Sequence, residues 1–168
     1  MLARINREVA NLGPALINLR HVKSFTAWAD QEQKRNPMPF AADDREHSGR
    51  LNTIAGQTAP DTPGKKEGRL LVGFFRDARD QEYFMVVNMN YDRIKHSEHP
   101  WLVQRVRLGF TGDVQAVERL SRTTGKVERL ELDGHELVFD LPGATGDLFK
   151  FATGEPFTGV EPRDGGTR

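Results

Sequence analysis

The stretch RLLVGFFRDARDQEYFMVVNM, residues 69–89, decides the fold. Two apolar segments, 69–75 and 82–89, lie on either side of a charged turn at 76–81. Two such segments joined by a short polar turn indicate a β-hairpin. The second segment is apolar on both faces, which is typical of a central strand that is covered on both sides. The pair therefore predicts an antiparallel hairpin in the middle of a sheet.

Further strands follow this hairpin at short, regular intervals. They are expected at residues 101–110, 114–120, 126–132, 136–141 and 147–152. The turn 121–125 joins two of them into a second hairpin, in which Gly125 can adopt a positive φ angle. Helical spacing is missing between the strands, which argues against a parallel α/β sheet. About seven short strands in this region predict a mainly β fold, an antiparallel β-sandwich.

An amphipathic helix is expected at residues 1–20, before the strands. Its apolar positions follow steps of three and four residues and are Leu2, Ile5, Val9, Leu12, Leu16 and Leu19. We expect Gly13-Pro14 to kink or divide this helix, because proline lacks an N–H group and clashes with the preceding turn. A single short helix cannot bury its own stripe. Ile5, Val9, Leu12 and Leu16 therefore need a cover: the sandwich, a second copy of the chain, or a domain outside it.

The remaining segments show no sustained period. Residues 21–68 are polar and contain several prolines, with apolar anchors only at Phe25, Trp28, Phe40, Leu51 and Ile54. This composition predicts a long irregular connector that lies on the surface. Residues 153–168 are rich in glycine and proline and predict a loose tail. The chain is thus expected to divide into a helix (1–20), a connector (21–68), a β-sandwich (69–152) and a tail (153–168).

Composition limits the classes of function. Lys plus Arg and Asp plus Glu are both 24, so the formal net charge is zero and nothing favours nucleic acid as a partner. The chain has no cysteine, which excludes disulfides, thiolate metal sites and a cysteine nucleophile. No apolar run approaches the roughly 20 residues of a membrane helix, so no membrane association is expected. No signal peptide is recognisable, and the cellular compartment stays open.

One loop holds the most pointed cluster of candidate binding residues. His96 and His99 flank Glu98, and Trp101 follows them. This group could hold a zinc ion only if a further ligand came from elsewhere, so a hydrated loop without metal is the favoured interpretation. Trp101 could stack on a sugar ring, although a tryptophan that opens a sandwich strand more often packs in the core. The same two alternatives apply to Trp28.

Carboxylates are poorly arranged for catalysis. Asp43, Asp44 and Glu46 lie in the polar connector, where nothing is expected to hold or desolvate them. Asp77 and Asp80 lie in the hairpin turn, where aspartate commonly accepts hydrogen bonds from nearby backbone. No catalytic residue, metal or cofactor is therefore expected.

The polar end of the central strand should be structural. Asn88 ends an apolar strand, and its amide must find partners if it is buried. We expect it to hold the loop that follows.

The order of these parts resembles the C-terminal region of certain retaining glycoside hydrolases. Asn6-Arg7-Glu8, Leu12-Gly13-Pro14 and Leu16-x-x-Leu19-Arg20 look like the last helix of a (β/α)8 barrel. The segments LVGFF (71–75), YFMVVN (83–88), TGK (124–126), LPG (141–143) and GDLF (146–149) resemble the C-terminal β-sandwich that follows such a barrel. The likeness covers most of 1–20 and 69–152 and fails in 21–68.

This resemblance implies a chain without the catalytic part of the enzyme. In such enzymes the catalytic carboxylates lie at the C-terminal ends of barrel strands, none of which occurs here. We therefore expect a non-catalytic, structural or accessory module whose partner is a (β/α)8 barrel or a second copy of itself. The alternative is a carbohydrate-binding module that uses exposed aromatic residues and takes a polysaccharide as its ligand. A small stand-alone hydrolase ranks third.

Overall fold

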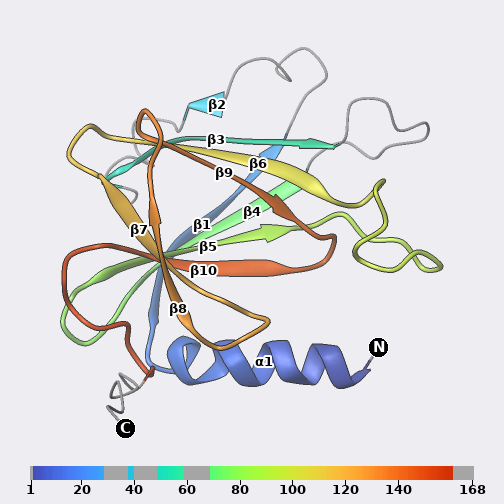
Figure 1. Ribbon diagram of the computed structural model, residues 1–168, viewed down its shortest axis with the longest axis horizontal. Helices are drawn as coiled ribbons and strands as arrows, with labels where there is room; N and C mark the ends of the chain where they lie inside the picture. Colours follow the sequence, from blue (N-terminus) through green and yellow to red (C-terminus); the bar gives the residue numbers. More distant parts are fainter. Residues whose placement is uncertain (1, 29–37, 40–48, 59–68, 161–168) are drawn as a thin grey trace, which may run out of the picture.

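A computed structural model describes residues 2–28, 38–39, 49–58 and 69–160 (Figure 1). Its elements are one helix, α1 (Leu2–Leu16), and the strands β1 (Arg20–Trp28), β2 (Met38–Pro39), β3 (Leu51–Thr58), β4 (Arg69–Arg76), β5 (Glu82–Asn88), β6 (Gln104–Phe110), β7 (Ala116–Leu120), β8 (Val127–Glu131), β9 (Glu136–Leu141) and β10 (Gly146–Phe151). No helix in the described ranges is long and apolar enough to cross a membrane. The mainly β class predicted from the sequence is confirmed.

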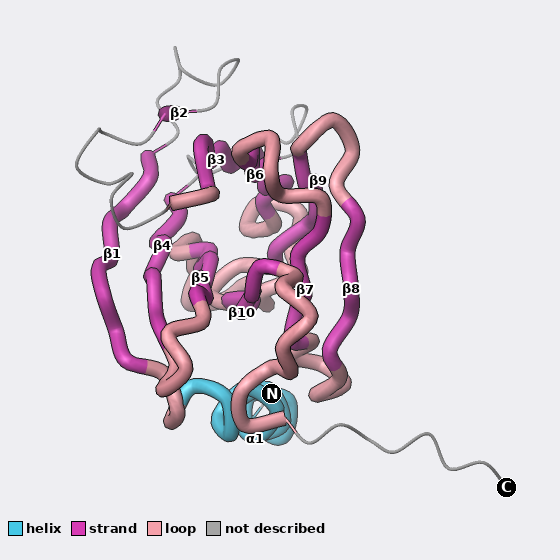
Figure 2. The backbone as a smooth tube through the Cα atoms, turned by 90° about the vertical axis from the view of Figure 1, so that its left-hand side faces the viewer, coloured by secondary structure: helices cyan, strands magenta, loops and turns pink. Residues whose placement is uncertain are grey.

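The strands form two antiparallel sheets that pack face to face (Figures 1 and 2). The larger sheet has the order β1-β4-β5-β10-β7-β8, and the smaller has the order β2-β3-β6-β9. Apolar side chains of both sheets meet between them, as in a β-sandwich. The aromatic centre of this core is Phe84, whose ring stacks on that of Phe149 with 5.0 Å between centroids.

The hairpin 69–89 occupies the centre of the larger sheet. β5 pairs with β4 on one side and with β10 on the other. Phe84 and Val86 point into the core between the sheets, whereas Tyr83 and Met85 point to the outer face. Both faces are covered, which is why the sequence of β5 is apolar on both sides.

The predicted connector 21–68 is wrong in three places, because it contains strands β2 and β3 and all of β1 except Arg20. β1 is an edge strand of the larger sheet and, among the described strands, pairs with β4 alone, with Phe25 opposite Val72. β3 pairs with β6, and only Leu51 and Ile54 of its side chains are buried apolar residues. A strand with so few buried apolar positions has a weak alternating pattern, so its pairing depends on the neighbouring strand.

The helix α1 packs against the outer face of the larger sheet with one of its halves (Figure 2). Leu12 is 6% exposed and Ala15 is fully buried, in a cluster with Leu120, Leu148 and Tyr83. In the other half, Ile5 is 47% exposed and Val9 is 64% exposed, although both lie on the same stripe as Leu12.

Of the two outcomes expected from Gly13-Pro14, a kink or a division, the division does not occur. The helix continues as one element to Leu16. Pro14 lies in the last turn of the helix, which ends two residues later at Leu16. The buried Ala15 and the partly buried Leu16 hold this turn against the sheet. Asn11 adds a polar tie, since its Nδ2 donates to the carbonyl of Arg122 over 2.8 Å.

Residues 153–160, which we call the C-terminal segment, are not a loose tail as predicted. Phe157 is buried in the same cluster as Leu12, and its ring meets that of Tyr83 at 5.2 Å between centroids. Gly159 has a φ angle of +67° and passes so close to α1 that a Cβ atom there would lie 1.9 Å from the carbonyl oxygen of Pro14. The remainder of the predicted tail, 161–168, lies outside the described residues.

Replacing Gly159 by alanine should destabilise the protein, because the new methyl group would both clash with Pro14 and strain the backbone. We expect a loss of about 2–4 kcal/mol in the free energy of unfolding, measured by urea denaturation. Gly154→Ala is the matched control, since Gly154 has a φ angle of +86° but nothing within 4 Å of its Cβ position. Equal losses in the two variants would contradict the close approach to α1.

Candidate functional site

The loop between β5 and β6, residues 89–103, carries most of the predicted binding residues. It folds through short turns, in which the N–H of His99 donates to the carbonyl of His96 and the N–H of Leu102 donates to that of His99. The N–H of Gly143 donates to the carbonyl of Ser97 over 2.8 Å, which ties this β5–β6 loop to the turn before β10.

Asn88 holds the base of the β5–β6 loop, as predicted. Its fully buried amide donates from Nδ2 to the carbonyls of Leu102 and Leu141 over 2.7 and 2.8 Å. Its Oδ1 accepts from the backbone N–H of Asn90 and from Nε2 of Gln104. One side chain thus joins the start of the loop to its end and to β9.

Trp101 packs within its own loop. Nζ of Lys95 lies 4.2 Å from the centroid of the indole ring, a cation–π contact that occupies one face. The ring of His99 meets the indole at 5.2 Å between centroids with an interplanar angle of 78°. The indole is half-buried, and these two neighbours restrict its use as a platform for a sugar.

The two histidines lie close together without forming a set of metal ligands. The ring centroids of His96 and His99 are 6.1 Å apart. Within the described ranges, three or more His, Asp or Glu side chains do not gather anywhere in a way that could hold a metal ion.

Trp28 ends β1, with its backbone opposite that of Arg69. It therefore comes from an edge strand and not from a connector. Its side chain, and the carboxylates of Asp43, Asp44 and Glu46, lie outside the described residues.

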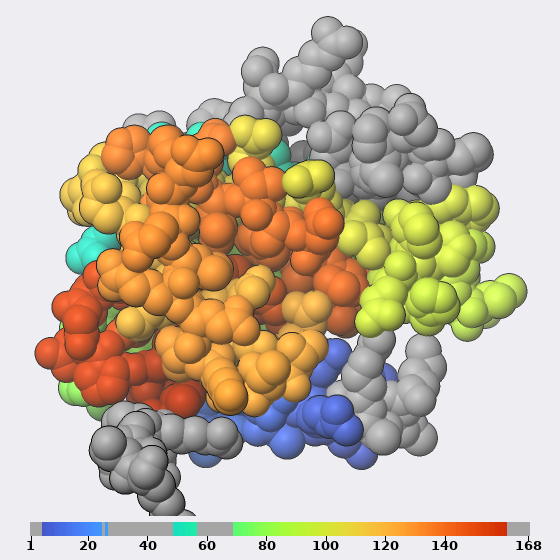
Figure 3. Space-filling view, viewed as in Figure 1, coloured from blue at the N-terminus to red at the C-terminus, as the bar shows by residue number. Residues whose placement is uncertain are grey.

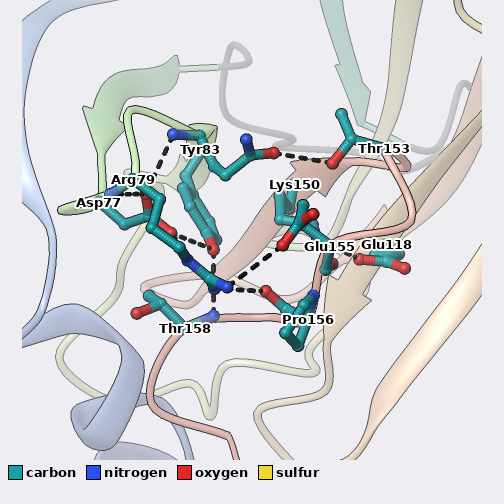
Figure 4. A network of polar contacts seen from close by, with 10 residues as sticks. Asp77, Arg79, Tyr83, Glu118, Lys150, Thr153, Glu155, Pro156 and Thr158 are labelled. Carbon is teal, nitrogen blue, oxygen red and sulfur yellow. Dashed lines mark hydrogen bonds and ion pairs between the residues drawn. The ribbon is translucent and has the colours of Figure 1, made fainter.

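A second group of polar side chains lies beside the β4–β5 turn (Figure 4). Asp77 is buried there, and its Oδ1 accepts from the backbone N–H groups of Arg79 and Gln81 over 2.9 and 3.0 Å. Its Oδ2 accepts from the hydroxyl of Tyr83 over 3.2 Å, and that hydroxyl accepts from the N–H of Thr158. The expected turn-forming role of Asp77 is confirmed.

The same group continues into the C-terminal segment. Nη1 of Arg79 lies 3.2 Å from Oε2 of Glu155, and its Nη2 donates to the carbonyl of Pro156. Oγ1 of Thr153 donates to Oε1 of Gln81 over 2.7 Å. Figure 4 shows these side chains as bridges between the turn and the segment that passes below it.

Lys150 is a fully buried lysine at the edge of this group. Its Nζ lies 3.0 Å from Oε2 of Glu118 on the neighbouring strand β7, and it also donates to the carbonyl of Glu155. A buried ammonium group is tolerated only when it is paired in this way. The sequence DLFKFA does not indicate the role of Lys150, because its partners lie on β7 and in the C-terminal segment.

The contacts of this group hold the C-terminal segment against the β4–β5 turn. Burial raises the pKa of Tyr83 from 10.0 to about 12, so the hydroxyl stays protonated and donates to Asp77 even in moderately alkaline solution. The carboxylates of Asp77, Glu118 and Glu155 are each engaged with neighbouring donors or cations. We therefore assign the group to holding the C-terminal segment in place.

A pocket of about 680 Å³ opens beside the β5–β6 loop. It is lined by residues 89–94 and by Arg69 at the start of β4. Neither the predicted Trp101 nor the two histidines belong to its described lining. Tyr91 and Arg93 do, and the sequence offered no periodic signal for them, because they lie in an irregular loop.

Comparisons with known proteins found no relative. No family model, no curated protein and no solved structure matches the chain.

Replacing Tyr83 by phenylalanine should loosen the C-terminal segment, because Asp77 loses a donor and the N–H of Thr158 loses its acceptor. We expect a loss of about 1–3 kcal/mol in the free energy of unfolding, measured by urea denaturation at neutral pH. Tyr91→Phe, at a tyrosine that is 65% exposed, is the matched control and should change stability little. A Tyr83→Phe variant with an unchanged free energy of unfolding would contradict the role of Tyr83 in holding the C-terminal segment.

The raised pKa of Tyr83 predicts a change in stability in alkaline solution. The hydroxyl ionises near pH 10.0 in the unfolded chain but only near about 12 in the folded protein. Its contribution is therefore complete below pH 10.0 and is lost as the pH rises toward about 12. The difference in free energy of unfolding between wild type and Tyr83→Phe should shrink across this interval. A difference that stays constant would contradict the assigned shift.

Proposed function

We propose that this chain is a non-catalytic accessory β-sandwich module that docks on a (β/α)8 barrel through the N-terminal half of α1. The observation that carries the proposal is the division of the apolar stripe. Leu12 and Leu16 pack in a cluster on the sheet, whereas Ile5 and Val9 on the same stripe stay largely exposed. An amphipathic helix gains stability from covering its apolar stripe, so the exposed half suits a contact with another domain.

A barrel is the partner that the sequence favours. The helix resembles the last helix of the barrel in retaining glycoside hydrolases, where it packs against neighbouring barrel elements on one side. In this chain the half near Leu12 already belongs to the sandwich. The half near Ile5 and Val9 is then the part that would contact the barrel.

The state of the buried carboxylates supports a non-catalytic role. In the described part of the chain the buried acidic residues are Asp77 and Asp147. Asp147 pairs with Arg122 and lies 3.6 Å from Nη1 of Arg119, and Asp77 accepts hydrogen bonds in its turn. A glycoside hydrolase instead needs two carboxyl groups that face a shared substrate space.

Sugar stacking on Trp101 receives less support than docking. The cation–π contact of Lys95 and the edge contact of His99 both use the indole ring.

The docking proposal predicts a complex that depends on Ile5 and Val9. The chain is titrated, by isothermal calorimetry, with the barrel of a retaining glycoside hydrolase from which its own C-terminal sandwich has been deleted. Aspartate at Ile5 or Val9 should weaken the complex at least about tenfold, since burying such a side chain contributes roughly 1.5–3 kcal/mol. Ile17→Asp is the matched control, because Ile17 is 83% exposed and lies beyond the end of α1.

Two results would overturn docking on a barrel. One is the absence of a complex with any such barrel. The other is a homodimer, measured by analytical ultracentrifugation, that Ile5→Asp dissociates. That result would assign the stripe to self-association instead.

The non-catalytic role predicts an absence of turnover. Purified chain should release no more nitrophenol from a panel of nitrophenyl glycosides than a buffer blank does. Hydrolysis that Asp77→Asn abolishes, with the fold retained by circular dichroism, would contradict the proposal.

A further inference from the structure

We propose that two copies of this chain pair through the open edge of β8 and form a symmetric dimer with one continuous sheet. β8 ends the larger sheet, and among the described strands it pairs with β7 alone. Figure 2 shows β8 at one side of the molecule, with no other described strand outside it. Figure 3 shows the orange residues of this region on the face toward the viewer. An edge strand presents a row of backbone N–H and C=O groups that a further strand can pair with.

The hydrogen bonds between β7 and β8 decide which residues of β8 face this edge. Just before β8, the N–H of Ser121 donates to the carbonyl of Lys126 over 2.9 Å, and just after it the N–H of Leu132 donates to the carbonyl of Gln115 over 3.0 Å. The register between these two bonds is unbroken. Bonded pairs recur at every second residue of an antiparallel ladder, so residues 126, 128, 130 and 132 direct their backbone groups toward β7. The residues between them direct theirs to the open edge: Val127, Arg129 and Glu131.

Two of these edge-facing residues carry opposite charges. Nε of Arg129 lies 2.7 Å from Oε1 of Glu131, and the two side chains are 56% and 68% exposed. They are two residues apart in the strand and therefore share one face of the sheet. When two β8 strands pair antiparallel about Leu130, Arg129 of each copy lies opposite Glu131 of the other. The interface then contains two cross-strand pairs of opposite charge, which stabilise a sheet.

The other symmetric registers of β8 are less favourable. Centring the pair on Arg129 sets two arginines directly opposite each other, and centring it on Glu128 or Glu131 does the same with two glutamates. Like charges in directly opposite positions destabilise a sheet. Centring the pair on Val127 sets β8 against the turn 121–125 instead of against the second β8. The register about Leu130 is therefore the one that the charge pattern selects.

The same register suits the backbone and the core. Arg129 and Glu131 both face the edge, so each pair of them across the interface can exchange two N–H···O=C bonds. Leu130 then occupies the position between those bonded pairs, where opposite side chains approach most closely. It lies opposite the buried Val117 of β7 and is itself only partly buried at the margin of the core. Contact with Leu130 of the second copy would cover apolar surface that a single chain leaves in water.

A second copy of this chain is the occupant that fits the edge. Charged residues on an edge strand discourage pairing with arbitrary strands. Arg129 and Glu131 admit a strand that presents the opposite charge at both positions, and β8 itself does so when it runs antiparallel. The pairing uses the same edge of both copies, so it closes at a dimer and does not extend into a fibre. The inference goes beyond the docking of α1 and does not depend on it, because β8 and the helix share no residue.

The test is sedimentation equilibrium of the full chain over a wide range of concentrations. We expect a dimer with a dissociation constant on the order of 10 µM, because one pair of short strands buries less surface than a standard interface. Arg129→Glu should raise this constant at least about tenfold, since both charge pairs become like-charge contacts. Glu131→Arg should do the same for the same reason. Both side chains are exposed, and circular dichroism checks that the variants fold.

The decisive measurement is made on a mixture of the two variants. Alone, each variant meets like charges at both contacts. In the mixture, the Arg129→Glu chain meets the Glu131→Arg chain with opposite charges at both contacts, so a heterodimer should form with nearly the wild-type dissociation constant. A double variant that carries both substitutions should dimerise by itself.

Arg107→Glu is the matched control. Arg107 also forms an exposed ion pair, 2.6 Å from Glu136, but it lies on β6, which has a strand on each side. This variant should leave the dimer unchanged. The proposal is overturned if the wild-type chain stays monomeric at every concentration, if Arg129→Glu leaves a dimer intact, or if the mixed variants do not associate.

Discussion

The structure depends on burying both faces of the central strands β5 and β10. Phe84 and Phe149 stack in the core between the two sheets. The opposite face of the same strands carries Tyr83 and Leu148. Two packed sheets alone would leave this face exposed to solvent. Two further elements, α1 and the C-terminal segment, cover that face (Figures 1 and 2). The helix and the last described residues are therefore a third layer that the apolar sequence of β5 requires.

This third layer is held by polar contacts as much as by apolar ones. Lys150 lies on the outer face of β10, next in alternation to Leu148, and would be an uncompensated buried charge without Glu118. The C-terminal segment contributes the carbonyl of Glu155 to the same ammonium group and the N–H of Thr158 to Tyr83. Because each partner comes from a different stretch of chain, the polar group holds the segment in one position. An apolar contact alone would allow it to slide.

The molecule has two exposed surface features that do not share residues. One is the exposed half of α1, which continues an apolar stripe whose other half already packs on the sheet. The other is the pocket of the β5–β6 loop, which combines exposed apolar side chains with a donor-rich lining. Each surface can be altered without touching the core, since Ile5 and Tyr91 are both exposed.

The sequence by itself determined the strands of residues 69–152, the helix and its stripe, and the anchoring role of Asn88. These features are local, because alternation and helical spacing report which face of an element is buried. Strands β1 and β3, the packed C-terminal segment and the partners of Lys150 were not predictable in this way. In the sequence, Gly159 is one of several glycines in a predicted loose tail, and only the structure shows how closely it approaches Pro14. Tyr91 is likewise an ordinary loop residue in the sequence, and only the structure places it in the lining of a pocket. Only the tertiary structure decided these, because an edge strand, a buried charge and a pocket each depend on residues that are distant in sequence.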